Sequence, residues 1–230
     1  MPMGSAPVQA TASSAAPRQK LPSLILIQAD GTDGEAFTID AESVTVGRNT
    51  GPLFASDSFL SPMHATFKWH QDTLSVTDEG SLNGVYLRIP PNVPIELADG
   101  AMFRIGQEIV RAESIQTAST MKDGEEIMGS PSRGIVARIA TLVGRETIGD
   151  AYPVPTAGLH LGRERGEVLF PEDGYVSGLH CRIHQERGKL MLTDVGSSNG
   201  TYLRVPSHRA VALSSGDLLL VGQQLFRVSF

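Results

Sequence analysis

The chain has 230 residues, of which 40% are hydrophobic and 19% are charged, a composition typical of globular proteins rather than disordered ones. Its formal net charge of −6 argues against a nucleic-acid backbone as the main ligand, and no apolar run approaches the ~18 residues that a membrane-spanning helix needs. Cys181 is the single cysteine, which excludes an internal disulfide and a cysteine-based zinc site and favours a reducing, cytoplasmic location.

Strand signals dominate the chain after a polar N-terminal tail. Residues 1–22 are rich in Ala, Ser and Pro and lack the apolar core of a signal peptide, so they predict a disordered tail. Short apolar or alternating runs follow at roughly ten-residue intervals, separated by Gly, Pro, Asp and Asn, which predicts antiparallel sheets. Residues 113–134, rich in Ser, Thr, Gly and Glu, predict a linker. The clearest runs are residues 24–27, 43–46, 65–69, 74–77, 159–161, 182–184 and 189–192.

One pattern of short motifs occurs twice in this order, and the later motifs align without a gap at an offset of 116 positions. Each copy has a Gly-Arg pair, then Ser-x-x-His, then a turn that contains Asn-Gly. A repeat of this period is too long for a solenoid unit and suits a duplicated small domain. It predicts two homologous domains, residues 23–112 and residues 135–230. The motifs begin at Gly47, Ser61 and Ser81 in the first copy and at Gly162, Ser177 and Ser197 in the second.

The combined pattern resembles the forkhead-associated family, whose signature is Gly-Arg, Ser-x-x-His and Ser/Thr-Asn-Gly in this order. The resemblance covers nearly all of residues 24–112 and 136–230. It implies an all-β fold of two consecutive antiparallel β-sandwiches that read phosphothreonine with loops at one end. It also implies a non-catalytic signalling adaptor without a cofactor, whose partners are phosphothreonine proteins or a Ser/Thr protein kinase.

The residue types of the motifs suit a phosphate ligand. A phosphothreonine carries about −1.5 to −2 charges and three strong acceptor oxygens. Arginine can meet these oxygens with a planar fork of donors, a serine hydroxyl adds a neutral donor, and an asparagine amide can pair with a peptide backbone. By the resemblance, the binding residues of the second copy are Arg163, Ser177, Ser198 and Asn199, with Gly178 and Arg165 beside them. Arg48, Ser61 and Asn83 form a weaker first site, and His64 and His180 are structural braces.

The same residues and their neighbours also allow other roles. Asp78 and Asp194 are predicted to be turn residues that accept backbone amides. Arg88 and Arg204 flank the turn in both copies, and the sequence leaves open whether they are exposed structure or contact the ligand. A hydrolase triad and a histidine metal site are disfavoured because no nucleophile elbow surrounds either serine and the histidines do not converge.

The two copies differ in ways that rank them. Leu82 stands where Ser198 offers a hydroxyl, and Val85 stands where the second copy has Thr201. Residues 24–112 contain 5 Lys and Arg against 12 Asp and Glu, whereas residues 135–230 contain 10 against 9, so the second copy is expected to repel an anion less. The sequence therefore predicts that phosphothreonine binds mainly to the second copy. The alternative is a phosphate-independent scaffold or oligomeric structural component, and the oligomeric state stays open.

Overall fold

The computed structural model describes residues 21–115, 134–145 and 147–230. Most of the predicted N-terminal tail and of the predicted linker lies outside these residues. The fold is almost entirely β, as predicted, with one short helix, α1 (Gly51–Ala55), among the described residues. Among the described residues, all strand pairs are antiparallel except β12–β13, which is parallel.

The strands follow the sequence repeat closely. The first repeat forms β1 (Ser23–Ile27), β2 (Asp33–Thr38), β3 (Ser43–Val46), β4 (Ala65–His70), β5 (Thr73–Asp78), β6 (Val85–Arg88), β7 (Ile95–Glu96), β8 (Met102–Ile105) and β9 (Glu108–Ser114). The second repeat forms β10 (Ile135–Leu142), β11 (Ile148–Pro155), β12 (Leu159–Gly162), β13 (Val168–Leu169), β14 (Cys181–Glu186), β15 (Lys189–Asp194), β16 (Thr201–Arg204), β17 (Val211–Leu213), β18 (Leu218–Val221) and β19 (Gln224–Ser229).

The two sandwiches do not coincide with the two repeats. Sandwich one consists of β1–β6 and β17–β19, with β17-β5-β4-β3 as one sheet and β2-β1-β19-β18-β6 as its half of a continuous ten-stranded sheet. Sandwich two consists of β7–β16, with β13-β12-β14-β15-β7 as one sheet and β11-β10-β9-β8-β16 as the other half of the ten-stranded sheet. The predicted division into residues 23–112 and 135–230 therefore describes the repeat but not the folded bodies. Sandwich two is continuous in the chain, and sandwich one is built from the two ends around it.

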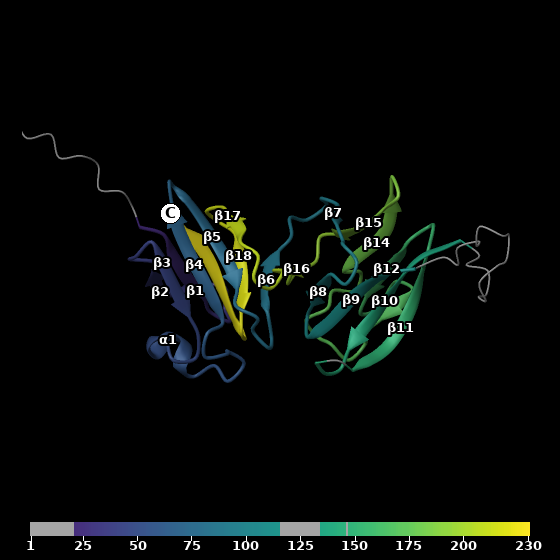
Figure 1. Ribbon diagram of the computed structural model, residues 1–230. Helices are drawn as coiled ribbons and strands as arrows, with labels where there is room; N and C mark the ends of the chain where they lie inside the picture. The colour runs from purple at the N-terminus through teal and green to yellow at the C-terminus, as the bar shows by residue number, and fades with distance from the viewer. Residues whose placement is uncertain (1–20, 116–133, 146) are drawn as a thin grey trace, which may run out of the picture.

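Strands β6 and β16 join the bodies at the centre of the molecule, where Figure 1 shows them side by side. Leu87 pairs with Leu203, and Arg88 and Tyr86 pair with Tyr202 and Arg204 on either side, so the contact is nearly symmetric. The chain then passes to the other sandwich through proline-containing segments, Ile89-Pro90-Pro91 after β6 and Val205-Pro206 after β16. Proline fixes its own φ and holds the preceding residue extended, which favours a straight crossing over a return turn.

Each hydrophobic core combines residues of both repeats. In sandwich one, Phe67 and Val76 of the first repeat pack in the same cluster as Phe226 of the second. In sandwich two, Phe103 of the first repeat shares a cluster with Ile183 of the second. Buried side chains alternate with less buried ones along strands such as β5, where Leu74, Val76 and Asp78 are buried, because successive residues point to opposite faces. Separating the repeats would open both cores.

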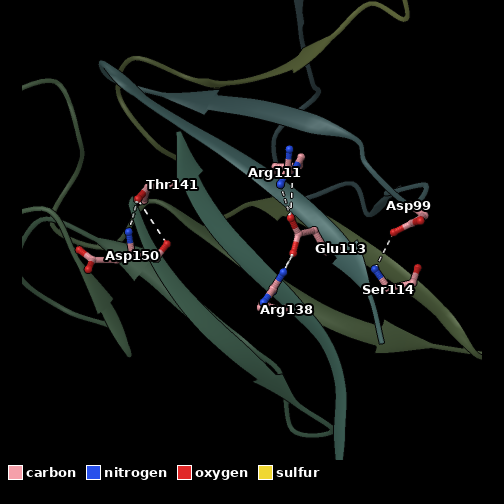
Figure 2. A network of polar contacts seen from close by, with 7 residues as sticks. All are labelled: Asp99, Arg111, Glu113, Ser114, Arg138, Thr141 and Asp150. Atoms are coloured by element: carbon pink, nitrogen blue, oxygen red, sulfur yellow. Dashed lines mark hydrogen bonds and ion pairs between the residues drawn. The ribbon is translucent and has the colours of Figure 1, made fainter. Parts of the chain in front are cut away.

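Polar contacts also cross between the repeats (Figure 2). Glu113 on β9 accepts hydrogen bonds from Arg111 Nε (2.8 Å) and from Arg138 Nε on β10 (2.6 Å). Burial raises the pKa of the Glu113 carboxyl, but its hydrogen bonds to the two arginines outweigh this and lower that pKa below its usual range. In the loops, Asp57 accepts the backbone N–H of Gln223 and Asp173 accepts that of Gln107.

Candidate functional site

The motif residues of the first repeat come together at one end of sandwich one. Arg48 follows β3, Ser61 precedes β4, and the turn of residues 79–84 joins β5 to β6. The backbone N–H of Arg48 donates to Ser61 O (3.1 Å), the backbone N–H of Leu82 donates to Ser61 Oγ (3.1 Å), and Asn83 Nδ2 donates to Phe59 O (2.7 Å). Three loops that are separate in sequence are thus tied into one surface.

Sandwich two repeats this arrangement almost atom for atom. The backbone N–H of Arg163 donates to Ser177 O (2.9 Å), that of Ser198 donates to Ser177 Oγ (3.0 Å), and Asn199 Nδ2 donates to Tyr175 O (2.8 Å). The first site is hereafter Arg48, Ser61, Leu82 and Asn83, and the second site is Arg163, Ser177, Ser198 and Asn199. In both sites the serine hydroxyl accepts a backbone N–H and keeps its own hydrogen for a further acceptor.

A buried histidine connects two loops in each site. The backbone N–H of Ser61 donates to His64 Nδ1 (3.0 Å), and that of Ser177 donates to His180 Nδ1 (3.0 Å). Since Nδ1 accepts, the ring hydrogen is on Nε2, which donates to the carbonyl of Gly84 or of Gly200 at 3.1 Å. Burial lowers the pKa of both histidines and so favours the neutral ring that this geometry needs.

The hydrogen bonds of the histidine also argue against a Ser-His-Asp hydrolase triad. Both ring nitrogens of His180 are engaged by backbone groups, so neither is placed to take a proton from the Ser177 hydroxyl. Within residues 21–115, 134–145 and 147–230, no group of three or more His, Cys, Asp and Glu side chains could hold a metal ion.

A carboxylate supports each Asn-Gly turn from below. Asp194 accepts the backbone N–H groups of Gly196 and Ser197 (both 2.8 Å) and the hydroxyls of Ser197 (2.6 Å) and Thr201 (2.7 Å). Burial raises the pKa of Asp194, but the hydrogen bonds from Ser197 and Thr201 bring it below its usual value. The turn role predicted for this aspartate is confirmed.

The hydrogen bonds to this aspartate also show the role of one of the two sequence differences between the copies, Thr201 in the second and Val85 in the first. Thr201 is fully buried and its hydroxyl donates a hydrogen bond to Asp194, so it supports the turn from beneath and does not face the loop surface. In the first repeat Asp78 accepts Ser81 N, Ser81 Oγ and the backbone N–H of Val85 at 2.8–3.0 Å. Val85 therefore changes the support of the turn, whereas Leu82, 55% exposed, changes the surface itself.

Comparison with known proteins identifies the family. A model of the FHA domain matches residues 44–106 and 159–222, which is more than half of the chain. The chain belongs to the FHA domain family. FHA domains are phosphothreonine-binding modules, and the resemblance drawn from the motifs is confirmed.

Two curated relatives illustrate this FHA membership. The chain is 32% identical over 85 residues to the oxoglutarate dehydrogenase inhibitor of Corynebacterium jeikeium, covering 36% of this chain and 59% of that protein. It is 32% identical over 107 residues to the glycogen accumulation regulator GarA of Mycobacterium tuberculosis, covering 44% and 66%. The alignments thus span less than two thirds of either relative. One relative is named as an inhibitor of oxoglutarate dehydrogenase and the other as a regulator of glycogen accumulation.

A solved structure from a study of phosphothreonine-dependent FHA domain interactions shares 25% sequence identity with the chain. The match covers 36% of this chain and 85% of the solved chain, with a TM-score of 0.23.

In the part of the chain that the structure describes, no helix is long and apolar enough to cross a membrane.

The structure adds an arginine from the other repeat to each FHA site. Arg204 lies at the first site, where its Nη2 donates to Ser81 O (3.1 Å) and a Cβ placed on Gly84 would lie 2.5 Å from its Nε. Arg88 lies at the second site, 2.3 Å from the position of a Cβ on Gly200. Both glycines also have positive φ, so a side chain there would be strained as well as blocked.

The sequence shows that Arg88 and Arg204 flank the turn in both copies, but it does not predict that each arginine contacts the turn of the other copy. The available signal was the identical position of Arg88 and Arg204 in the two copies. What the repeat could not show was that each arginine reaches the turn of the other copy, because that depends on how β6 and β16 pair.

The remaining candidate residues of the second FHA site lie around Arg163. Its Nη2 is 2.7 Å from Glu164 Oε1, in a pair that is partly open to solvent on both sides. The carbonyl of Gly178 accepts the backbone N–H groups of Glu164 (3.1 Å) and Arg165 (2.8 Å), which fixes this loop against the Ser-x-x-His segment. The side chain of Arg165 is exposed beside it.

The difference in net charge between the two copies becomes smaller when the charges are counted by sandwich. Residues 23–88 with 205–230, which contain sandwich one, carry 5 Lys and Arg against 10 Asp and Glu. Residues 89–204, which contain sandwich two, carry 12 against 15. The net charges of −5 and −3 differ far less than the −7 and +1 of the repeats. The ranking of the sites therefore depends on Leu82 and not on overall charge.

Proposed function

We propose that this protein is a phosphothreonine-peptide adaptor whose second site is the stronger reader. The observation that carries the proposal is that hydrogen bonds tie together the loops of Arg163, Ser177, Ser198 and Asn199, residues that supply a guanidinium and two serine hydroxyls. Preorganised donors of this kind suit a dianionic phosphate, because they cost little ordering when the ligand binds.

The ligand phosphate would have to displace one contact. Arg163 is paired with Glu164, and this exposed pair is worth no more than about 1 kcal/mol. A phosphate carries nearly two charges and can accept both arms of the guanidinium, so it competes well for Arg163. The side chain of Asn199 holds Tyr175 O through its amide nitrogen, which leaves its carbonyl oxygen to accept a backbone N–H of the peptide.

The first site is proposed to bind the same class of ligand more weakly. Leu82 cannot replace the hydroxyl of Ser198, although its backbone N–H holds Ser61 in the same way. A hydrogen bond to a charged group is worth about 1.5–3 kcal/mol, so the loss corresponds to roughly a 10- to 100-fold weaker complex. The partners we propose are threonine-phosphorylated proteins or a Ser/Thr protein kinase in the cytoplasm.

Calorimetric titration of the full chain with phosphothreonine peptides tests the proposal. Because each sandwich draws on both repeats, single-site variants of the whole chain are better reagents than separated repeats. Arg163→Ala should remove the tighter binding and leave the weaker, and the double variant with Arg48→Ala should bind nothing. Arg187→Gln, in the exposed turn between β14 and β15, is the matched control and should bind as the wild type does.

Two results would contradict the proposal. Unchanged affinity in a well-folded Arg163→Ala variant would move the phosphate contact to another cation, with Arg165 the next candidate. Equal binding of phosphorylated and unphosphorylated peptides, or no binding of either, would favour the phosphate-independent scaffold. A peptide with phosphoserine in place of phosphothreonine should bind at least about fourfold more weakly, since it lacks one buried methyl group.

A further inference from the structure

A groove of about 650 Å³ lies between the two sandwiches, next to the turn of the first site. Leu82, Asn83 and Tyr86 of sandwich one line it on one side. Strands β8 and β9 and the turn at Leu142–Arg145, all in sandwich two, line it on the other. The segment around β16 completes it, with Arg204, Ser207 and His208. The groove thus exists because halves of the two repeats are exchanged.

The charge of this groove is opposite to that of the whole chain. Arg145 and Arg204 line it, together with His208, whereas none of its described lining residues carries a carboxylate, although the chain has a net charge of −6. Arg204 is held in place, since its Nη2 donates to Ser81 O and its Nη1 lies 3.3 Å from Met102 Sδ. Arg145 is exposed. One fixed and one accessible guanidinium therefore line the groove, a combination that suits an anionic ligand.

Apolar side chains line the same groove. Leu82 and Val143 are 55% and 71% exposed, from opposite sandwiches, and both belong to the lining. Met102, Ile109 and Leu142 add further apolar surface. A ligand with both a carboxylate and an apolar side chain fits this combination better than a free anion does.

A buried hydroxyl in the lining points to a ligand independently. Tyr86 is only 3% exposed, and among the described residues its hydroxyl has no hydrogen-bond partner. Its counterpart in the second repeat, Tyr202, donates to Asn199 O at 3.0 Å. Buried hydroxyl groups in folded proteins are normally paired, so the unpaired one at the first site is suited to an acceptor supplied by a ligand.

We propose that this groove extends the first site and binds an acidic and apolar peptide segment beside the phosphothreonine. Carboxylates of that segment pair with Arg145 and Arg204, and its apolar side chain packs between Leu82 and Val143. The inference rests on the proposed function of the first site and names its ligand class. Leu82 then contributes to binding as well: it lacks the hydroxyl that would donate to the phosphate, but its side chain forms one wall of the groove.

The test uses the full chain with the second site silenced by Arg163→Ala. Two phosphothreonine peptides are titrated, one with Asp and Leu residues around the phosphothreonine and one with Asn and Ser in their places. The acidic peptide should bind about fivefold more tightly. Adding Arg145→Gln should reduce this preference, because one of the two guanidinium partners is lost, and leave the affinity for the neutral peptide unchanged. Arg187→Gln again serves as the charge-matched control and should keep the preference.

The outcomes separate the groove from the first site itself. Equal affinity for the two peptides, or a preference that Arg145→Gln does not reduce, overturns the groove and leaves phosphothreonine binding at the first site intact. Failure of both peptides to bind a chain that melts normally overturns the first site and the groove together. Tyr86→Phe provides a second variant, which should weaken the acidic peptide without lowering the Tm, because the removed hydroxyl has no partner in the protein.

Discussion

Removing the hydroxyl of Ser198 should isolate its contribution to phosphate binding. The side chain is exposed, and the contact that holds its turn is made by its backbone N–H to Ser177 Oγ at 3.0 Å. Ser198→Ala therefore leaves the loop in place and deletes a single donor. A hydrogen bond to a charged acceptor is worth about 1.5–3 kcal/mol, so the affinity of the second site should fall roughly 10- to 100-fold.

The assay is calorimetric titration of the full chain in an Arg48→Ala background, where only the second site is expected to bind. Leu82→Ala changes the same turn position in the other repeat and should leave this affinity unchanged. Leu82→Ser, measured in an Arg163→Ala background with the neutral peptide that does not use the groove, should raise the affinity of the first site by about tenfold. A Ser198→Ala variant that binds as tightly as the wild type would refute the assignment of this hydroxyl to the phosphate.

Three further predictions follow from the contacts beneath and between the sites. Thr201→Val removes a buried hydroxyl that donates to Asp194 and should destabilise the fold by about 2 kcal/mol. Scanning calorimetry should then show a Tm lower by about 4–8 °C. An unchanged Tm would show that Asp194 finds another donor. Burial lowers the pKa of His64 and His180 in the folded protein below the value of 6.5 expected in the unfolded chain, so the neutral rings stabilise the fold fully above pH 6.5. This stabilisation is lost as the pH falls through the pKa of the folded state, and the Tm should therefore decrease below about pH 6.5. A Tm that does not change with pH in this range would contradict the neutral rings. A fragment of residues 89–204, which contains all strands of sandwich two, should melt cooperatively by circular dichroism, and a fragment that stays unfolded would argue against the exchanged topology.

Much of each site could be predicted from the sequence because it is local. Ser61 and His64 are three residues apart, as are Asp78 and Ser81, and their hydrogen bonds depend mainly on loop geometry. Short motifs with such spacings indicate the same loop wherever they occur. The role of Thr201 was less accessible, since its position beside the turn is compatible both with ligand contact and with support from below. Only the bond to Asp194 distinguishes them.

The sequence by itself determined the all-β fold, the duplication and the composition of both loop surfaces. It could not decide which strands complete which sandwich, because the repeats offer nearly identical partners: Tyr-Leu-Arg occurs in both β6 and β16. The tertiary structure decided this through the pairing of β6 with β16 and the extended proline segments that follow each of them. That choice carries Arg204 to the first site and Arg88 to the second and opens the groove between the sandwiches. Such contacts join residues more than a hundred positions apart, and no local pattern encodes their partner.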